Sequence, residues 1–229
     1  MSYVLHYAPD NASLIIRLAL DSIGAPYRTV LVDRAQNAQR SAAYLRRNPN
    51  GLIPTLDTPD GPIFETGAIL LWLVDRHGAL GPRLDDPGRA DFLKWLFFCA
   101  NTVHPYLQLL FYPHKLVGDD ASLRAAVTDG AARGICRHLD TLEAAAGTAF
   151  GTDTLTVIDM YLAAMLRWCA IYGPDDRTWF RLAMWPRLHH ICTRMDAAQA
   201  TTIAQTAEGL GPTPFTAPTR PNPPEGSAL

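Results

Sequence analysis

Small polar side chains interrupt an apolar stretch near the start of the chain, and their types and spacing could support binding or catalysis. The stretch is YAPDNASLIIRLAL, residues 7–20. Its polar residues Asp10, Asn11 and Ser13 separate a strand-like segment from an apolar helical one. Polar groups at a helix start can cap its free N–H groups, or they can join those groups in holding an anion. The stretch therefore predicts a plain cap or an anion site, and both remain open at this point.

A second set of candidates lies in NPNGLIPTLDTPDGPIFETG, residues 48–67. Thr66 directly precedes a helical pattern, so its hydroxyl and the first free N–H groups can cap the helix or receive a carboxylate from a ligand. Ile53 precedes Pro54, and an X–Pro bond costs only about 0.5 to 1 kcal/mol to hold in the cis form. In the plainer interpretation, Pro54 only begins a strand.

Metal and thiol-redox chemistry find little support in the sequence. The chain has four cysteines, at Cys99, Cys136, Cys169 and Cys192. They form no C-x-x-C pair and no metal-type spacing with histidine, so we interpret them as buried free thiols and expect no metal site. A thiol-disulfide redox role fits worst, because no cysteine precedes Cys99.

Composition and charge exclude two other classes of partner. The net charge is -2 with 18% charged residues, which is not the basic excess that a phosphate backbone requires. No apolar run approaches the roughly 20 residues of a membrane span, and the N-terminus lacks a signal-peptide pattern. We therefore expect a cytoplasmic protein with no nucleic-acid or membrane partner.

The hydrophobic pattern predicts the elements that position these groups. Residues 3–7 and 27–33 are rich in β-branched and aromatic residues and are predicted strands. A helix over 13–23, which stops at Gly24, connects them, so the two strands should be parallel. A second, polar helix is predicted from about 38 to 47.

A hairpin and a third helix complete the first predicted domain, residues 1–80. Turn chemistry at 59–61 predicts short strands over 55–58 and 62–64. A helical repeat of apolar residues then continues to Gly78. The resulting order is βαβαββα, a small mixed sheet with helices.

Beyond a linker at 81–88, the pattern is helical only, over residues 89–208. Helices are predicted at about 90–116, 122–146, 157–171 and 186–200. The last segment, 209–229, contains six prolines and little apolar periodicity, so we expect a Pro-rich tail that is disordered or laid over the surface.

This order of elements, together with four local motifs, resembles the glutathione S-transferase family. The motifs are NPNGLIPTL, ETGAILLWL, TVIDMYL and ANTVHPYLQLLF, and the last is similar to a stretch of the bacterial beta-type members. Together the elements and motifs span residues 3 to about 200. The resemblance implies an α/β + all-α architecture, with a thioredoxin-like N-terminal domain (βαβαββα) followed by an α-helical C-terminal domain.

The resemblance also implies four glutathione-binding residues, which are Ile53, Pro54, Glu65 and Thr66. In the family the proline is cis, and the residue before it pairs through its backbone with the cysteinyl part of glutathione. Glu65 and Thr66 would hold the γ-glutamyl end, with the threonine hydroxyl and N–H on its carboxylate. The T-x-x-D spacing that starts at Thr156 is a capping box, and we interpret it as structural.

In the family, the loop after the first strand activates the glutathione thiol. Donors and a helix N-terminus lower the thiol pKa from its usual value of about 8.5. The candidate catalytic residues are Ser13, Asn11 and Tyr7, with a plain helix cap as the alternative for Ser13. The cysteine of beta-type members falls on Ala12, which puts thiol reductase activity in doubt. Asp10 lies near the serine of theta-like members, where a carboxylate would repel a thiolate.

The second domain would hold the electrophile. Candidate pocket residues are His104, Tyr106, Phe111 and Trp168, since beta-type members carry a histidine that faces the cleft. The alternatives are a histidine at a helix kink beside Pro105 and aromatic side chains that belong to the core.

The resemblance implies a glutathione transferase whose thiolate attacks an apolar electrophile. Glutathione is then a co-substrate, no metal is needed, and the partner chain is a second copy in a homodimer. The same site could serve glutathione-dependent isomerisation, dehalogenation or ether cleavage. A non-catalytic ligand-binding or interaction protein of the same fold is the competing class.

Overall fold

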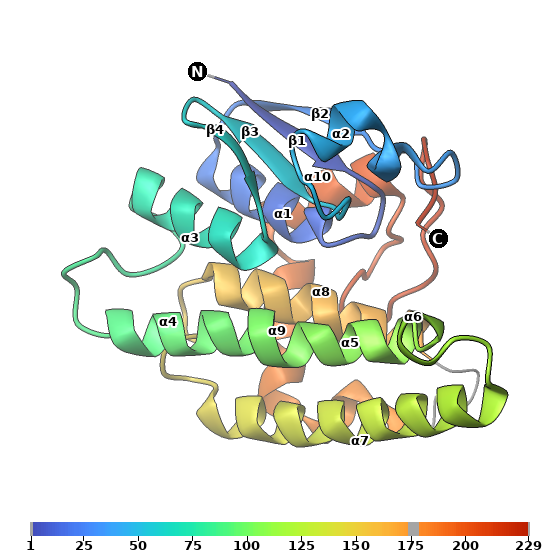
Figure 1. The fold of residues 1–229 in the computed structure, drawn as a ribbon. Helices are drawn as coiled ribbons and strands as arrows, with labels where there is room; N and C mark the ends of the chain where they lie inside the picture. Colours follow the sequence, from blue (N-terminus) through green and yellow to red (C-terminus); the bar gives the residue numbers. More distant parts are fainter. Residues whose placement is uncertain (1, 174–178, 229) are drawn as a thin grey trace.

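The N-terminal part of the computed structural model, which describes residues 2–173 and 179–228, is a four-stranded sheet. The strand order is β2-β1-β3-β4 (Figure 1). The strands are β1 (Tyr3–Tyr7), β2 (Tyr27–Leu31), β3 (Thr55–Thr58) and β4 (Gly61–Phe64). β1 and β2 are parallel, as predicted, whereas β3 is antiparallel to both β1 and β4.

The helix α1 (Ser13–Ile23) is apolar on nearly all sides because it packs between the sheet and the helical part (Figure 1). Leu14, Ile16 and Leu20 are fully buried. The helix ends, as predicted, at Gly24, whose φ of 70° is costly for residues with a Cβ. Contacts on two sides fix α1, and its N-terminus lies beyond the carboxyl end of β1.

The helical part surrounds one buried helix, α8 (Val157–Ile171). The other helices are α3 (Thr66–His77) beside the sheet, then α4 (Arg89–Phe98), α5 (His104–Phe111), α6 (His114–Val117), α7 (Ala121–Ala145), α9 (Pro186–Asp196) and α10 (Gln199–Glu208). The predicted capping box of α8 is confirmed, because Asp159 Oδ2 accepts from the Thr156 N–H at 2.8 Å. The predicted extents of α7 and α8 are correct to within a residue.

Three predicted helices are shorter or interrupted. The segment predicted at 90–116 contains a π-helical turn, Cys99–Val103, and α5 ends at Phe111. Pro105 has no N–H, so a continuous i→i−4 ladder cannot pass through this point. The helix predicted at 38–47 is a 3-10 turn followed by the short α2 (Ala42–Leu45). The helix predicted at 186–200 is two helices, α9 and α10, with a break between them.

The Pro-rich segment is more tightly packed than its composition predicts. Leu210 and Phe215 are 0% and 1% exposed, so the first half of this segment is neither disordered nor only laid over the surface, and the expectation was wrong there. Its end runs back beside the sheet, on the side of the β2–α2 connection (Figure 1). There Arg34 donates through Nη1 to the carbonyl of Ala228 at 2.7 Å and through Nη2 to the hydroxyl of Tyr112 at 3.2 Å.

Candidate functional site

The loop before β3 presents the backbone of Ile53 without a partner. The Ile53–Pro54 peptide bond is cis, as the resemblance implies. The preceding carbonyl, that of Leu52, accepts from Tyr44 Oη at 2.7 Å and from Asn48 Nδ2 at 2.8 Å. In the described part of the chain, no hydrogen bond uses the N–H or C=O of Ile53. The loop is therefore held in place while these two backbone groups stay available to a ligand.

The start of α3 is a strained and tightly packed helix N-terminus. Glu65 has φ 71°. This conformation costs a non-glycine residue about 1–3 kcal/mol and is frequent at ligand sites. Thr66, the first residue of α3, is 8% exposed. A Cβ added to Gly67 would lie 3.1 Å from the Cβ of Ala100, so glycine permits the close approach to the helical part. The first-turn N–H groups lack intrahelical partners and can receive a carboxylate.

The loop between β1 and α1 separates the roles of Asn11 and Ser13. Ser13 is fully buried, and its hydroxyl donates to the carbonyl of Ala8 at 2.9 Å and accepts from the Ala8 N–H at 3.3 Å. Ser13 is therefore neither a free donor nor a cap, since it lies inside α1 and closes the loop. Asn11 is partly exposed, and its Oδ1 accepts from the Ala12 N–H at 2.8 Å. The Nδ2 group of Asn11 donates to no described residue, so it is the available side-chain donor of this loop.

The third candidate, Tyr7, is held by the C-terminal segment. Its hydroxyl donates to Glu225 Oε1 at 2.5 Å, and the Arg17 guanidinium carbon lies 4.9 Å from its ring centre. Burial, followed by the hydrogen bond to Glu225, raises the pKa of Tyr7. In this arrangement Tyr7 donates its hydroxyl proton to Glu225. A residue that activates glutathione would instead have to donate that proton to the sulfur.

Asp10 is the centre of a buried polar cluster that the sequence did not predict. Its two carboxylate oxygens each accept from Arg167, both at 2.9 Å. Trp168 Nε1 and Tyr172 Oη donate to the same carboxylate at 3.0 and 2.7 Å. The expectation that Asp10 would repel a thiolate was wrong in its premise, because the guanidinium of Arg167 offsets the charge. Residues 10 and 167 lie far apart in sequence, and no local pattern connects them.

A second buried ion pair holds the same loop from α10. Glu208 accepts from the Asp10 N–H at 2.8 Å and from Arg17 Nε at 2.7 Å. Burial raises the pKa of Glu208 to about 7, although Arg17 opposes the shift. The β1–α1 loop is thus fixed by groups from α1, α8 and α10 together.

His104 lies at the boundary between the sheet part and the helical part. Its Nδ1 is 2.8 Å from the hydroxyl of Tyr161, and burial lowers the pKa of His104 to about 4. Tyr161 is 1% exposed. A predicted pocket residue therefore has a buried hydroxyl of α8 as its partner. Tyr161 belongs to the motif TVIDMYL, but the motif gave no sign of this role.

Comparison with known proteins agrees with the fold. Residues 2–75 match the model of the glutathione S-transferase N-terminal domain. Over 179 residues the chain is 28% identical to glutathione S-transferase GST-4.5 of Xanthomonas campestris pv. campestris, covering 75% of this chain and 84% of the relative. The solved structure of a sphingomonad glutathione S-transferase complexed with glutathione is 28% identical, with a TM-score of 0.72, and covers 92% of this chain and 100% of that chain. Residues 2–75 therefore form a glutathione S-transferase N-terminal domain.

A third relative has a different activity in its name. Over 104 residues the chain is 32% identical to the maleylacetoacetate isomerase of Rhizobium meliloti, covering 45% of this chain and 49% of that protein. The alignment therefore spans about half of the isomerase. The thioredoxin-like sheet domain followed by a helical region is the glutathione S-transferase fold.

The structure separates the four pocket residues that family resemblance implied. His104 and Trp168 are neighbours, with ring centres 5.6 Å apart, but the Trp168 Nε1 is committed to Asp10. Phe111 packs on Tyr172 at 6.2 Å. Tyr106 instead packs into α7, with its ring centre 4.8 Å from that of His138. Tyr106 therefore belongs to the α5–α7 contact, and this part of the pocket prediction was wrong.

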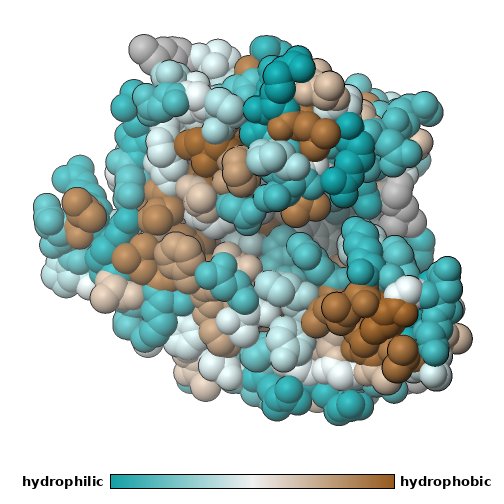
Figure 2. Space-filling model, viewed as in Figure 1, coloured by the Kyte–Doolittle hydropathy of each residue, from teal (hydrophilic) through white to brown (hydrophobic). Residues whose placement is uncertain are grey.

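The face of the molecule seen in Figure 2 has a hollow between the sheet part and the helices α5 and α6. Below it the same view shows an apolar patch. Leu116 of α6 and Leu123 of α7 are exposed apolar side chains of the helices on this side. Apolar surface beside the hollow suits an apolar second substrate.

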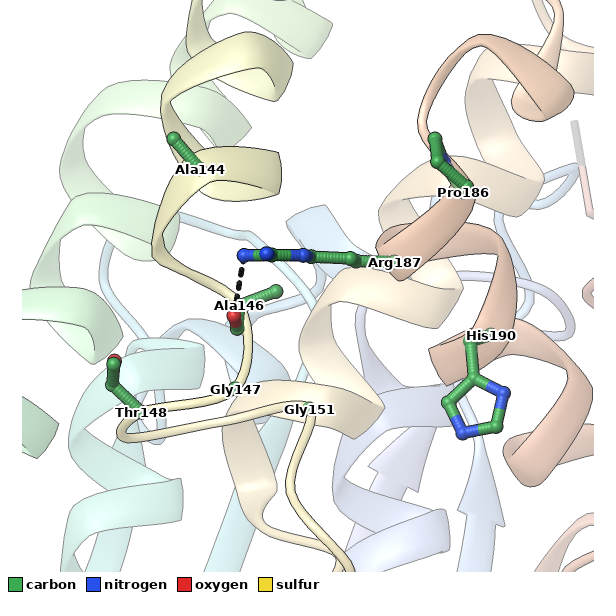
Figure 3. A pocket seen from close by; sticks show the side chains of 8 residues that line it. All are labelled: Ala144, Ala146, Gly147, Thr148, Gly151, Pro186, Arg187 and His190. Carbon is green, nitrogen blue, oxygen red and sulfur yellow. Dashed lines mark hydrogen bonds between the residues drawn. The ribbon is translucent and has the colours of Figure 1, made fainter.

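A separate groove of about 610 Å³ lies between the end of α7 and α9 (Figure 3). Arg187 crosses it and donates to the carbonyl of Ala146 at 3.1 Å. The N-terminus of α9 is already occupied, because Glu143 accepts from the N–H groups of Arg187 and Leu188. None of the candidate site residues lines this groove.

We also searched the described residues for metal sites, membrane-spanning helices and reactive cysteines. Residues 2–173 and 179–228 contain no cluster of three or more His, Cys, Asp or Glu side chains that could hold a metal ion. In the same ranges, no helix is both long and apolar enough to cross a membrane. The four cysteines are free thiols, as predicted, but Cys136 is only half-buried. Burial raises the pKa of all four thiols, so none is an activated nucleophile.

Proposed function

We propose that this protein binds glutathione between the cis-proline loop and the start of α3, and that it transfers the thiolate to an apolar electrophile. The observation that carries the proposal is the braced cis Ile53–Pro54 loop, whose Ile53 N–H and C=O have no partner in the described chain. The N–H and C=O of Ile53 can form hydrogen bonds with the backbone of the cysteinyl residue of glutathione. The N–H groups in the first turn of α3 can bind its γ-glutamyl carboxylate. In this proposal Pro54 maintains the cis turn, and the carboxylate of Glu65 lies close to the ammonium group of the γ-glutamyl residue of bound glutathione.

Thiol activation is assigned to the N-terminal end of α1. The Nδ2 group of Asn11 and the N–H of Ser13, which make no hydrogen bond with a described residue, can donate to sulfur and lower its pKa. Asp10 does not oppose a thiolate there, because its carboxylate is neutralised by Arg167. The thiol proton leaves to solvent, and the thiolate attacks an electrophile held in the hollow beside His104 and Phe111.

The first test is binding and thiol ionisation measured on the same protein. Glutathione binding is followed by calorimetry, and the thiolate is followed by its ultraviolet absorbance as pH rises. We expect saturable binding and a thiol pKa well below about 8.5. Thr66→Val should weaken binding about tenfold or more, since it removes a hydrogen bond to a charged group. Thr202→Val, at an exposed site on α10, is the matched control.

Two alternatives use the same site. The partial match to maleylacetoacetate isomerase favours glutathione-dependent isomerisation as the second activity to assay. Binding without a lowered thiol pKa would instead indicate a non-catalytic glutathione-binding protein, and absence of binding would overturn the proposal. The homodimer and the cytoplasmic location stay predictions.

A further inference from the structure

One arginine of the β2–α2 connection reaches across to the helical part. Arg34 donates through Nη2 to the hydroxyl of Tyr112 at 3.2 Å and through Nη1 to the carbonyl of Ala228 at 2.7 Å. Tyr112 follows the last residue of α5 and precedes α6. The hollow in Figure 2 lies between the sheet part and these two helices, so the bond joins the two sides that border it. Two neutral oxygens therefore hold the guanidinium in place there.

A second cation contacts the same tyrosine. Lys115 Nζ lies 4.0 Å from the centre of the Tyr112 ring. None of the ion pairs within residues 2–173 and 179–228 includes Arg34 or Lys115. Even the adjacent carboxylate of Asp33 accepts from a backbone N–H, that of Ala35, at 3.0 Å. Arg34 is half-buried, and a charge that is partly removed from water without a counter-ion costs free energy that a bound anion would recover.

The guanidinium of Arg34 still has donors for such an anion. It carries five N–H groups, and the two hydrogen bonds use one on each terminal nitrogen. Its Nε makes no hydrogen bond with a described residue, yet it is not among the buried polar atoms that lack a partner, so it reaches solvent. A guanidinium that keeps N–H groups on neighbouring nitrogens can bind a carboxylate through two parallel hydrogen bonds.

An apolar side chain lies next to these cations. Phe111, the last residue of α5, has its ring centre 6.4 Å from that of Tyr112 and 6.2 Å from that of Tyr172. Phe111 is also the residue beside which the electrophile is proposed to lie. An aromatic body on Phe111 can thus place a charged substituent beside Tyr112 and Arg34.

We propose that the second substrate is an apolar electrophile that carries a carboxylate, and that this carboxylate binds Arg34 with support from Lys115. The inference rests on the proposed function and narrows its substrate class. Arg34 is the main specificity-determining residue, because it is half-buried and its guanidinium is planar and held in place. The ammonium group of Lys115 is exposed and strongly hydrated, so it contributes less.

The test compares two conjugates of glutathione that differ in the charge of one group. They are S-(4-carboxy-2-nitrophenyl)glutathione and S-(4-carbamoyl-2-nitrophenyl)glutathione, and calorimetry with the full chain gives Kd for each. Both contain the whole of glutathione, so the ratio of the two Kd values reports only on the added group. We expect the carboxylate to bind about tenfold or more tightly than the carboxamide, the effect of hydrogen bonds to a charged group.

Three variants locate this preference. Arg34→Gln should reduce the Kd ratio about tenfold, and Lys115→Gln should reduce it about two- to fivefold. Arg133→Gln is the matched control, since it removes an exposed arginine of α7, and it should leave the ratio unchanged. A general loosening of the protein weakens both conjugates alike and does not move the ratio.

Two results would overturn this inference and leave the proposed function standing. The first is equal binding of the two conjugates by the unmodified protein. The second is an Arg34→Gln variant that weakens both conjugates equally, because Arg34 would then act on glutathione itself or on the fold. If neither glutathione nor its conjugates bind, the proposed function fails and this inference fails with it.

Discussion

At the scale of single residues, Asn11 and Ser13 are two positions apart but have opposite environments. Asn11→Ala removes the available side-chain donor of the β1–α1 loop, so we expect the thiol pKa of bound glutathione to rise and kcat to fall roughly ten- to hundredfold.

Ser13→Ala leaves the backbone of Ala8 without its partner and should lower the free energy of unfolding by about 1–3 kcal/mol, with the thiol pKa of bound glutathione unchanged. Thiolate absorbance and urea unfolding of both variants check this, and a thiol pKa that responds only to Ser13→Ala would reverse the assignment.

His104 gives a prediction about pH and stability. Its pKa is about 4 in the folded protein, against a usual value of about 6.5. Between these values the unfolded chain binds the extra proton, so His104 lowers stability as pH falls from about 6.5 toward 4. His104→Gln should therefore flatten the stability profile in that window. Urea unfolding at a series of pH values measures it, and an unchanged slope would show that His104 is not buried as neutral imidazole.

At the scale of elements, the Asp10–Arg167 pair joins the β1–α1 loop to α8. Both side chains are fully buried, so removing one partner leaves an unpaired charge that costs about 3–5 kcal/mol. We expect Arg167→Met to destabilise by this amount and the double change with Asp10→Asn to recover part of the loss. The coupling is measured by a double-mutant cycle in denaturant. Additive effects of the two changes would mean that there is no coupling energy between Asp10 and Arg167.

What could be predicted from the sequence is what local patterns encode. The βαβ unit, the stop of α1 at Gly24, the hairpin and the Thr156–Asp159 cap all rest on residues close together in the chain. The cis bond at Ile53–Pro54 came from family resemblance and is confirmed.

The parts that could not be predicted are contacts between distant residues. The Arg167 pair, the His104–Tyr161 bond and the Tyr7–Glu225 bond each join segments far apart in sequence. Ser13 shows the same limit at short range, since the side-chain type fits a cap, a sulfur donor or a loop closure equally well. Only the position of the Ala8 backbone distinguishes these roles.

At the scale of the whole molecule, the C-terminal segment connects the sheet part to the helical part. Arg167 donates to the carbonyls of Pro214 and Thr219, both at 3.0 Å, while Glu225 accepts from Tyr7. Near the end of the chain, Arg34 binds both the Ala228 carbonyl and Tyr112. Because Arg34 connects the tail to the end of α5, we expect the tail to border the hollow between the sheet part and the helices α5 and α6.

Removal of residues 222–229 tests this role because it spares the contacts of Arg167. The shortened chain loses the bond between Tyr7 and Glu225, so we expect the pKa of Tyr7 to fall and the free energy of unfolding to decrease by about 1–3 kcal/mol. With one border of the hollow gone, KM should fall for bulky electrophiles and stay unchanged for small ones. Glu225→Gln is the matched control, since it should lower the pKa of Tyr7 while the backbone border remains. Tyrosine absorbance against pH, urea unfolding and KM for electrophiles of increasing size measure the three effects. If KM for bulky electrophiles is the same in the shortened and full chains, the tail stabilises the fold without limiting the pocket.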